Sequence, residues 1–417
     1  MRNPLKNSGE TWALVFWCAL PILGQLTAPF YVLSAFFGRN REGAYRSDLL
    51  AFSSLCLAYV GYVAFVSLRV GDWSAASEPI GDAASLAITV CLATWVLRFR
   101  QHIDMGLAYR AAASMLIAVF LLTVVTGYWL NQPRPELLMK NPLNLGPTLL
   151  MPLLICTFWS FARSIVWQAI GALALFLGTM TVSSVLEARG TLLVLAVVMV
   201  ARLFWVVFSP RPKGTKFRDG LLIAVPLILA GMATVIFNDK LERLAPEAFG
   251  LQVVSPAQAS GVIVPDQEQT FVAGILPSDK STNERLWMLQ AGWKAFLDNP
   301  WLGYGAQNRF HGIRPYLPEG FPTYSHLHND FLTHAIAGGV PAVLFLVVLL
   351  GFPILVSLRA LRRRGDAFQL AVLCSAAFTG TALVNNVLFV DISAFTLGLS
   401  YLVLLLMIEA TGSPKIS

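Results

Sequence analysis

Charged side chains are scarce in this sequence. Only 13% of its 417 residues are Asp, Glu, Lys or Arg, whereas 56% are hydrophobic. A soluble domain carries roughly 25% charged residues, and a soluble chain of this length could not bury so much apolar side chain. The composition therefore excludes a single soluble domain. It also excludes a disordered chain, which needs the opposite balance, so the sequence predicts an all-α polytopic membrane protein.

The sequence also lacks any cysteine motif. Its five cysteines lie inside apolar runs with no close spacing, which excludes a cysteine zinc site and a disulfide framework. A cleavable signal peptide is not expected. The first apolar stretch, from Thr11 to Phe37, is too long for the hydrophobic part of such a peptide and lacks a clear cleavage site.

Ten further apolar runs are long enough to cross a bilayer, which takes about 20 residues. The runs are continuous rather than alternating, so we expect helices. They are 47–70, 78–98, 107–130, 143–162, 164–186, 190–208, 217–237, 339–358, 366–387 and 391–410. The stretch 11–37 is interrupted by Pro21 and Pro29. Two short helices there would give twelve spans and one would give eleven; we favour twelve.

The net charge of +7 could suggest a nucleic-acid partner. However, the basic residues lie between apolar runs and gather in alternate loops, which is typical of an orientation signal. We therefore expect no nucleic acid as a partner, and we expect the basic loops and the C-terminus to be cytoplasmic. The chain then divides into an N-terminal transmembrane bundle at 1–237, a long exterior loop at 238–326 and C-terminal transmembrane helices at 327–417.

One helix is clear inside the exterior loop. Ser281-Thr282-Asn283-Glu284 is a capping-box pattern, apolar residues follow at helical spacing, and Asn299-Pro300 ends the pattern. This predicts a helix at about 282–298. Residues 250–276 are rich in Pro, Gly and Ser and are expected to be irregular.

Two arginines stand out on the expected outer side. Arg189 lies in a minimal turn between two apolar runs, and Arg285 lies in the first turn of the loop helix, where the helix dipole disfavours a cation. The alternatives are an interfacial anchor for Arg189 and an exposed surface charge for Arg285. Because charges at span mouths are candidates for function and guanidinium groups match phosphate oxygens, we expect both to bind a lipid-linked phosphate or diphosphate.

Four of the five histidines lie between 311 and 334. A metal site is one interpretation of His326, His328, Asp330 and His334, but no specified metal motif is present. Interfacial polar residues without chemistry are a second interpretation. We favour proton transfer by a single histidine, whose pKa of about 6.5 suits it to that task. Two arginines could supply the charge stabilisation that Mg²⁺ supplies elsewhere, so neither a metal ion nor a cofactor is expected.

These residues resemble the motifs of bacterial O-antigen ligases. His328-Asn329, nine residues and Gly339-Val340-Pro341-Ala342 resemble the family signature His-Asn/Ser/Gln-x9-Gly-x-x-Gly, with Ala342 in place of the last glycine. Ala188-Arg189-Gly190 resembles the family's small-Arg-Gly turn. The stretch from Glu284 to Gly305 resembles its Arg-helix-Asn-Pro-x-x-Gly-x-Gly segment. The three motifs occur in order within about residues 187–345.

The resemblance implies an inverting, metal-independent glycosyltransferase of the multi-span C superclass. Such enzymes lie in the bacterial inner membrane, with the active site facing the periplasm. They transfer polysaccharide from undecaprenyl diphosphate to a hydroxyl of lipid A–core oligosaccharide, so donor, acceptor and membrane lipids are the implied partners. By the resemblance, Arg189 and Arg285 would hold the diphosphate and His328 would activate or orient the acceptor.

Four residues are accessory candidates beside these: His326, Asn329, Asp330 and Asp391. Asp391 could help to orient His328, although we favour a helix cap for it.

Three alternatives stay open. O-antigen polymerases and protein O-oligosaccharyltransferases belong to the same superfamily, and a transporter or flippase would share the hydropathy. The minimal turn at Arg189 and the single long loop favour the ligase. Candidate charges cluster at one outer face rather than at mid-span, which favours an enzyme over a transporter.

Overall fold

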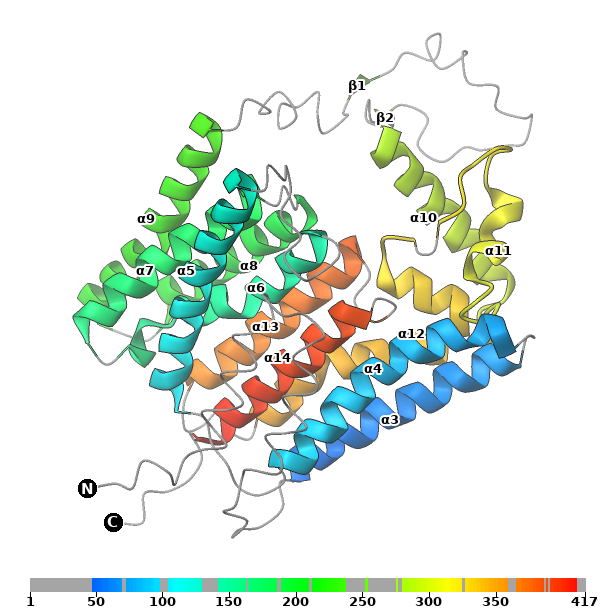
Figure 1. The fold of residues 1–417 in the computed structure, drawn as a ribbon, viewed down its shortest axis with the longest axis horizontal. Coiled ribbons are helices and arrows are strands. Elements are labelled where there is room, and N and C mark those ends of the chain that lie inside the picture. The colour runs from blue at the N-terminus through cyan, green and yellow to red at the C-terminus, as the bar shows by residue number, and fades with distance from the viewer. Residues whose placement is uncertain are drawn as a thin grey trace.

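The protein is a bundle of helices with a small helical cap at one end (Figure 1). The structure is a computed structural model, and it describes residues 47–69, 73–97, 104–129, 142–162, 164–185, 189–209, 212–237, 252–253, 275–276, 280–324, 327–358, 365–385, 388 and 391–410. The ambiguous stretch 11–37 and His326 lie outside these residues, so the choice between eleven and twelve spans stays a prediction.

Each of the ten predicted apolar runs forms a helix. The bundle helices are α3 Ser47–Leu68, α4 Trp73–Leu97, α5 Met105–Trp129, α6 Pro142–Cys156, α7 Ile165–Met180, α8 Arg189–Phe208, α9 Lys213–Phe237, α12 Asp330–Ser357, α13 Gly365–Val384 and α14 Asp391–Ala410. Six of the described helices are long and apolar enough to cross a membrane. A continuous helix satisfies its own backbone polar groups, as a segment within hydrocarbon must. With several such apolar helices, the chain is a multi-pass membrane protein.

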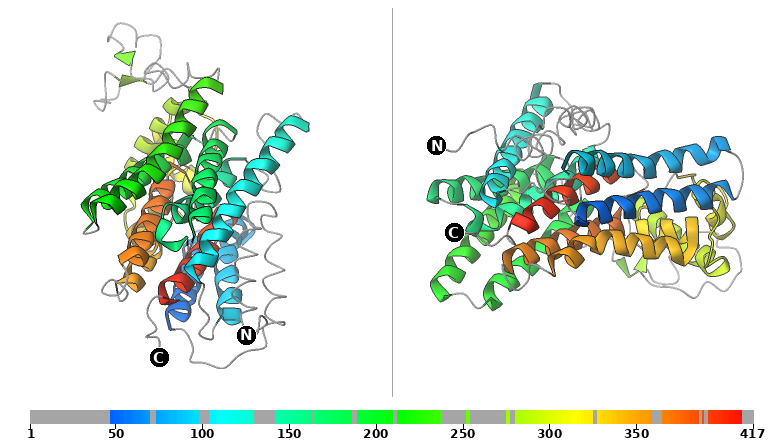
Figure 2. Two further views of the ribbon diagram at one scale, coloured as in Figure 1. Left: turned by 90° about the vertical axis from the view of Figure 1, so that its left-hand side faces the viewer. Right: turned by 90° about the horizontal axis from the view of Figure 1, so that it is seen from below.

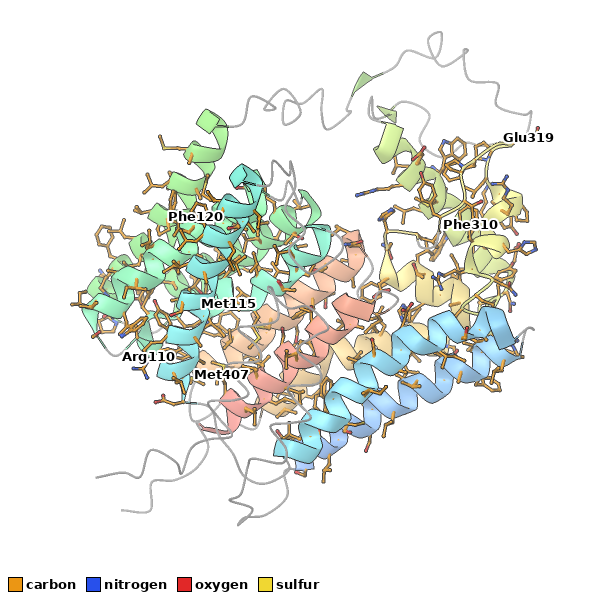
Figure 3. The ribbon with its side chains drawn as sticks, viewed as in Figure 1. Arg110, Met115, Phe120, Phe310, Glu319 and Met407 are labelled. Carbon is orange, nitrogen blue, oxygen red and sulfur yellow. The ribbon has the colours of Figure 1, made fainter. Side chains whose placement is uncertain are left out.

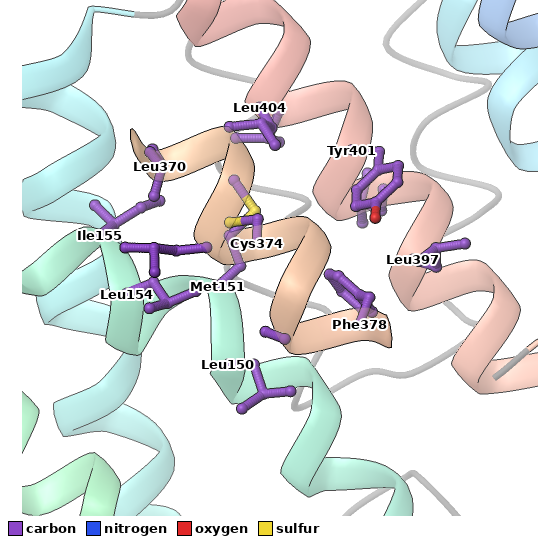
Figure 4. Packing of buried hydrophobic residues seen from close by; sticks show 14 of the residues in the cluster. Leu150, Met151, Leu154, Ile155, Leu370, Cys374, Phe378, Leu397, Tyr401 and Leu404 are labelled. Atoms are coloured by element: carbon purple, nitrogen blue, oxygen red, sulfur yellow. The ribbon is translucent and has the colours of Figure 1, made fainter. Parts of the chain in front are cut away.

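Helix α13 forms the centre of the bundle and packs against α6, α8 and α12. Figure 4 shows Cys374 of α13 between Met151 of α6 and Leu404 of α14, and all three side chains are buried. The outer faces carry exposed apolar residues such as Val197 and Phe204. This arrangement is expected when the solvent around the bundle is lipid.

The run 143–162 does not form one continuous helix. Helix α6 ends at Cys156, and a short 3₁₀ turn, η3 Trp159–Phe161, follows. Arg202 of α8 is buried there. Its guanidinium donates to the Thr157 carbonyl (3.2 Å) and to Gln369 Oε1 (2.8 Å), and it lies 4.0 Å from the Phe158 ring centroid. The early end of α6 is tolerated because this buried cation satisfies a carbonyl that the helix leaves open.

The α10–α11 cap, residues 280–324 with Leu327, has its own apolar core. It contains α10 Lys280–Asp298, α11 Arg309–Ile313 and the 3₁₀ turn η8 Arg314–Tyr316. Figures 2 and 3 show the cap at one end of α3 and α4, with Phe310 and Glu319 labelled in Figure 3. Its core joins the cap to the first turns of α12 through these buried residues: Met288, Ala291, Ala295, Ile313, Phe321, Leu327 and Ile336.

The predicted loop helix is confirmed, with its start at residue 280 rather than 282. Upstream of it, β1 Gln252–Val253 and β2 Ile275–Leu276 pair antiparallel within the stretch predicted to be irregular.

The cap is attached to the bundle at a second point. Arg69, which follows α3, donates to the carbonyls of Leu302 (3.0 Å) and Gly303 (2.8 Å).

Candidate active site

Helix α12 starts nine residues before the predicted run 339–358. Asn329 is its N-cap, because the side-chain oxygen accepts from the Leu332 amide (2.9 Å) and the backbone carbonyl accepts from the Thr333 amide (2.9 Å). The cap satisfies amides that the first turn leaves open. The early start was missed because the segment is polar, and apolar periodicity does not reveal it.

His328 stands immediately before this cap with a φ of 53°, which places a non-glycine residue in the left-handed region. Its side chain is half-buried. A left-handed conformation at such a residue persists where the surroundings determine it. The backbone on its C-terminal side is held firmly, because Asn329 caps α12 and also donates through Nδ2 to the Leu383 carbonyl of α13 (3.0 Å). We call Tyr324, His328, Asn329 and Asp330 the His328 corner.

A break divides α12 at Gly339, whose φ of 69° and ψ of −161° are not helical. The cap segment 299–305 lies in the break and replaces the interrupted helical bonds. Its backbone bonds to α12 are Tyr304 N to Ile336 O (2.7 Å), Gly305 N to Ala337 O (2.9 Å) and Val340 N to Pro300 O (2.7 Å). The Asn-Pro-x-x-Gly-x-Gly stretch and the glycine end of the histidine signature are therefore two sides of one contact.

The glycines of this contact admit no side chain. A Cβ at Gly339 would lie 2.4 Å from the Pro300 carbonyl oxygen, and one at Gly303 would lie 2.4 Å from the Ile336 carbonyl oxygen. Both glycines have positive φ. Ala342, which replaces the last glycine of the family signature, is buried. A Cβ built at Gly338 would lie 3.0 Å from the Ala342 methyl group, so this position is already closely packed with alanine.

Arg189 and the His328 corner lie at the same end of the bundle. Arg189 is the first residue of α8, and a Cβ at the adjacent Gly190 would lie 3.1 Å from Val384, the last residue of α13. Asn329 binds the preceding residue of α13, Leu383. The start of α8 and the start of α12 therefore both contact the last turn of α13.

Arg285 is linked to the same corner through Tyr324. It is exposed on α10, next to Glu284. The Tyr324 hydroxyl donates to Glu284 Oε2 (2.6 Å), and the Tyr324 ring lies edge-on to the His328 ring with centroids 6.4 Å apart. The hydrogen bond to Glu284, and next to it burial, raises the pKa of Tyr324 above the ordinary tyrosine value. Tyr324 therefore remains a donor at neutral pH and connects the helix of Arg285 to His328.

Asp330 and His334 are buried, and their hydrogen bonds run to other parts of the bundle. Asp330 Oδ2 accepts from the Leu388 amide (3.0 Å). His334 Nδ1 donates to the Asp330 carbonyl oxygen (2.7 Å), since a carbonyl only accepts, and lies 3.4 Å from Asp330 Oδ1. In the neutral ring, His334 Nε2 then accepts from the Tyr59 hydroxyl (2.6 Å). This chain joins α3, α12 and the segment before α14, so we interpret it as a support for the corner.

The metal interpretation concerned four residues, and the structure describes three of them: His328, Asp330 and His334. Within the described residues no group of three or more His, Cys, Asp or Glu side chains is close enough to hold a metal ion, and His326 is not among those residues. Asp391 is the first residue of α14, and its role as a helix cap stays a prediction.

Sequence reasoning missed Tyr59, Tyr324 and Arg202. A buried arginine inside an apolar run was a visible signal for Arg202, since charges at membrane depth need partners. No comparable signal marks the tyrosines. Tyr59 is separated from His334 by 275 positions and lies in an ordinary apolar helix.

Fold and site together define a multi-pass membrane protein with polar groups gathered at one end of its helices. Residues 148–347 match the family model described as O-antigen ligase. The matched region contains all three motifs, and the match supports the O-antigen ligase superfamily for this chain. No curated protein matches the chain.

Proposed function

We propose that this protein is an O-antigen ligase that transfers polysaccharide from undecaprenyl diphosphate to a hydroxyl of lipid A–core oligosaccharide. The observation that carries the proposal is the meeting of two separate motifs at the last turn of α13. In one motif Gly190, next to Arg189, lies against Val384, and in the other Asn329, next to His328, donates to the Leu383 carbonyl. A phosphate-binding group and a proton acceptor at one helix mouth suit the transfer of a sugar from a diphosphate.

In this proposal the two arginines stabilise the leaving group. Arg189 and Arg285 bind the diphosphate oxygens, whose negative charge increases as the sugar leaves. A guanidinium stays charged at all working pH values and offers a planar pair of donors, which a lysine does not. Because the arginines carry the stabilising charge, the scheme needs no metal ion and no cofactor.

His328 activates the acceptor. Its imidazole accepts the proton of the acceptor hydroxyl, and the hydroxyl oxygen forms a bond with the anomeric carbon of the donor. The bond between that carbon and the phosphate oxygen breaks, and undecaprenyl diphosphate leaves with the electron pair. Attack from the face opposite the leaving group inverts the configuration. Tyr324 and Asn329 keep the imidazole in place during this step.

The charge distribution supports a site that faces the periplasm of a bacterial inner membrane. Lys213, Lys216 and Arg218 lie in the first turns of α9, at the end of the bundle opposite Arg189. Basic residues favour the cytoplasmic side.

The short connection before Arg189 supports a ligase over a polymerase. Only three residues separate Val185 of the preceding π-helical turn, η4 Thr181–Val185, from Arg189. By the resemblance, polymerases carry a substantial loop there in addition to the long loop before α10.

The test is His328→Ala in a strain that lacks its own ligase, with His311→Ala as the matched control. His311 is an exposed histidine of the same cap. We expect His328→Ala to lower transfer by at least about 100-fold, with core-only lipopolysaccharide bands and accumulated lipid-linked polymer, and His311→Ala to be normal. Core plus one repeat unit in the strain without the protein would indicate a polymerase. Normal bands for His328→Ala would contradict the proposal.

A further inference from the structure

A cavity of about 430 Å³ lies beside α8. It is formed by α7 with its π-helical turn η4, by α8 and by α9, and α8 supplies the largest share of its wall: Leu192, Leu195, Ala196, Met199, Val200 and Leu203. Ala196, Val200 and Gly231 of this wall are exposed, so the cavity opens on the side of the bundle. We call it the α8 groove.

The polar atoms of the groove are directed to the backbone. Its two hydroxyl residues are Thr179 and Ser183. Thr179 donates to the Leu175 carbonyl (2.7 Å), and Ser183 donates to the Met180 carbonyl (3.5 Å). The remaining wall is aliphatic. Such a surface suits a hydrocarbon chain and is unfavourable for a sugar or a phosphate, which would lose hydrogen bonds to water without replacement.

The groove lies on the stripe of α8 that begins at Arg189. Residues three, seven, eleven and fourteen positions after 189 are Leu192, Ala196, Val200 and Leu203, and this spacing keeps one face of a helix. The groove therefore starts one turn from Arg189. From 192 to 203 it follows α8 for about 16 Å, the length of about three extended isoprene units.

Another face of α8 is turned toward the catalytic candidate. Gly190 and Val194 contact Val384 and Gly380 of α13, and α13 in turn contacts the His328 corner. In a lipid-linked donor the sugar and the hydrocarbon leave the diphosphate on opposite sides. A diphosphate at Arg189 can thus place its sugar toward α13 and its hydrocarbon toward the groove.

We propose that the α8 groove binds the first isoprene units of the donor's polyprenyl chain. This inference rests on the proposed function only for the identity of the donor. The groove holds the hydrocarbon next to the diphosphate, so it fixes the direction in which the head group enters the site.

Ala196→Phe tests the proposal, with Ala201→Phe as the matched control. Both alanines are exposed on α8, but position 201 is not part of the groove wall. We expect Ala196→Phe to raise KM for the undecaprenyl donor by at least about ten-fold. The phenyl ring would occupy part of the groove, so methylene groups of the polyprenyl chain would no longer be buried there. A donor with one isoprene unit, which is too short to reach position 196, should show a much smaller difference between the variants. Equal KM values for Ala196→Phe and Ala201→Phe with the undecaprenyl donor would overturn the proposal.

A binding experiment separates this inference from the proposed function. Photo-reactive benzoylphenylalanine is placed at 196 or at 201 in the protein in phospholipid nanodiscs, and radiolabelled undecaprenyl diphosphate is added. We expect labelling at 196 that excess unlabelled undecaprenyl diphosphate removes, and none at 201. Labelling without catalysis by the wild type would support the groove while contradicting the ligase. Labelling at 196 of phospholipid alone would overturn the groove, even in an active ligase.

Gly231→Phe is the second variant, in case Ala196→Phe fails to fold. Gly231 lines the groove, and a Cβ there meets no atom within 4 Å, so a side chain can begin at this position without a clash. Its control is Gly220→Phe, eleven residues earlier on α9, where a Cβ likewise meets nothing within 4 Å. A raised KM for Gly231→Phe alone is expected, and equal values for the two would overturn the proposal.

Discussion

The α12 break and the α8 groove are built in opposite ways, although both lie near Arg189 or His328. At the break, backbone from distant parts of the chain is so close that Gly339 and Gly303 admit no Cβ. In the groove wall, Gly231 has open space around its Cβ position. The break holds a fixed geometry through backbone hydrogen bonds, whereas the groove offers unoccupied apolar volume. Proton transfer at His328 requires a fixed geometry. A flexible hydrocarbon chain requires unoccupied apolar volume.

The largest expected effect comes from adding one methyl group at the break. Gly339→Ala forces an alanine into a glycine-only conformation and against the Pro300 carbonyl, at a cost of more than about 3 kcal/mol. We expect a large drop in the apparent Tm in detergent and loss of transfer. Gly351→Ala in the same helix, where a Cβ meets nothing within 4 Å, should keep the wild-type Tm or raise it. A stable Gly339→Ala protein would show that the break is not rigid.

Tyr59→Phe should have the next largest effect. It removes the donor to buried His334 Nε2, and leaving such an acceptor unsatisfied costs about 1–3 kcal/mol. Tyr109→Phe is the matched control, since Tyr109 is also buried but its hydroxyl has no hydrogen-bond partner among the described residues. Thermal unfolding in the same detergent compares the two. Equal losses of stability would mean that the chain from Tyr59 to Asp330 does not support the corner.

Tyr324→Phe should change activity more than stability. The ring beside His328 is kept, but the hydrogen bond to Glu284 is lost, and we expect kcat to fall by about three- to ten-fold. Tyr316→Phe, a half-buried tyrosine of the same cap core, should retain full kcat. A fall in kcat with Tyr316→Phe alone would remove Tyr324 from the site.

The pH dependence follows from the raised pKa of Tyr324. Because the folded protein holds this proton more tightly, the contribution of Tyr324 is complete below the ordinary pKa of about 10 and is lost only as the pH rises through the higher folded value. The ratio of Tyr324→Phe to wild-type kcat should therefore be constant between about pH 6 and pH 9. A ratio that changes in this range would mean that the hydroxyl ionises there.

The smallest effect is expected on the open side of the molecule. Gly220→Ala replaces a helical glycine that has no neighbour within 4 Å of its Cβ. The substitution should stabilise the protein by up to about 1 kcal/mol through helix propensity. A measured loss of stability in thermal unfolding would show that α9 is more tightly packed than the structure indicates.

The sequence predicted the helices well because each is a local, continuous apolar run. It predicted less well where long-range contacts decide the boundaries. Helix α6 ends early because Arg202 reaches Thr157 from another helix, and α12 starts early because Asn329 caps a polar first turn. The candidate residues came from motifs, and their roles stay predictions, since neither the fold nor the family match tests them.

The sequence by itself determined that this protein crosses a membrane many times, and it marked Arg189, Arg285 and His328. Composition and periodicity suffice for this, because the hydrophobic effect and helical hydrogen bonding act locally. Only the tertiary structure decided that the starts of α8 and α12 meet at α13, that residues 299–305 fill the break at Gly339, and that a groove follows α8. These features join residues far apart in the chain, so they depend on how the helices pack.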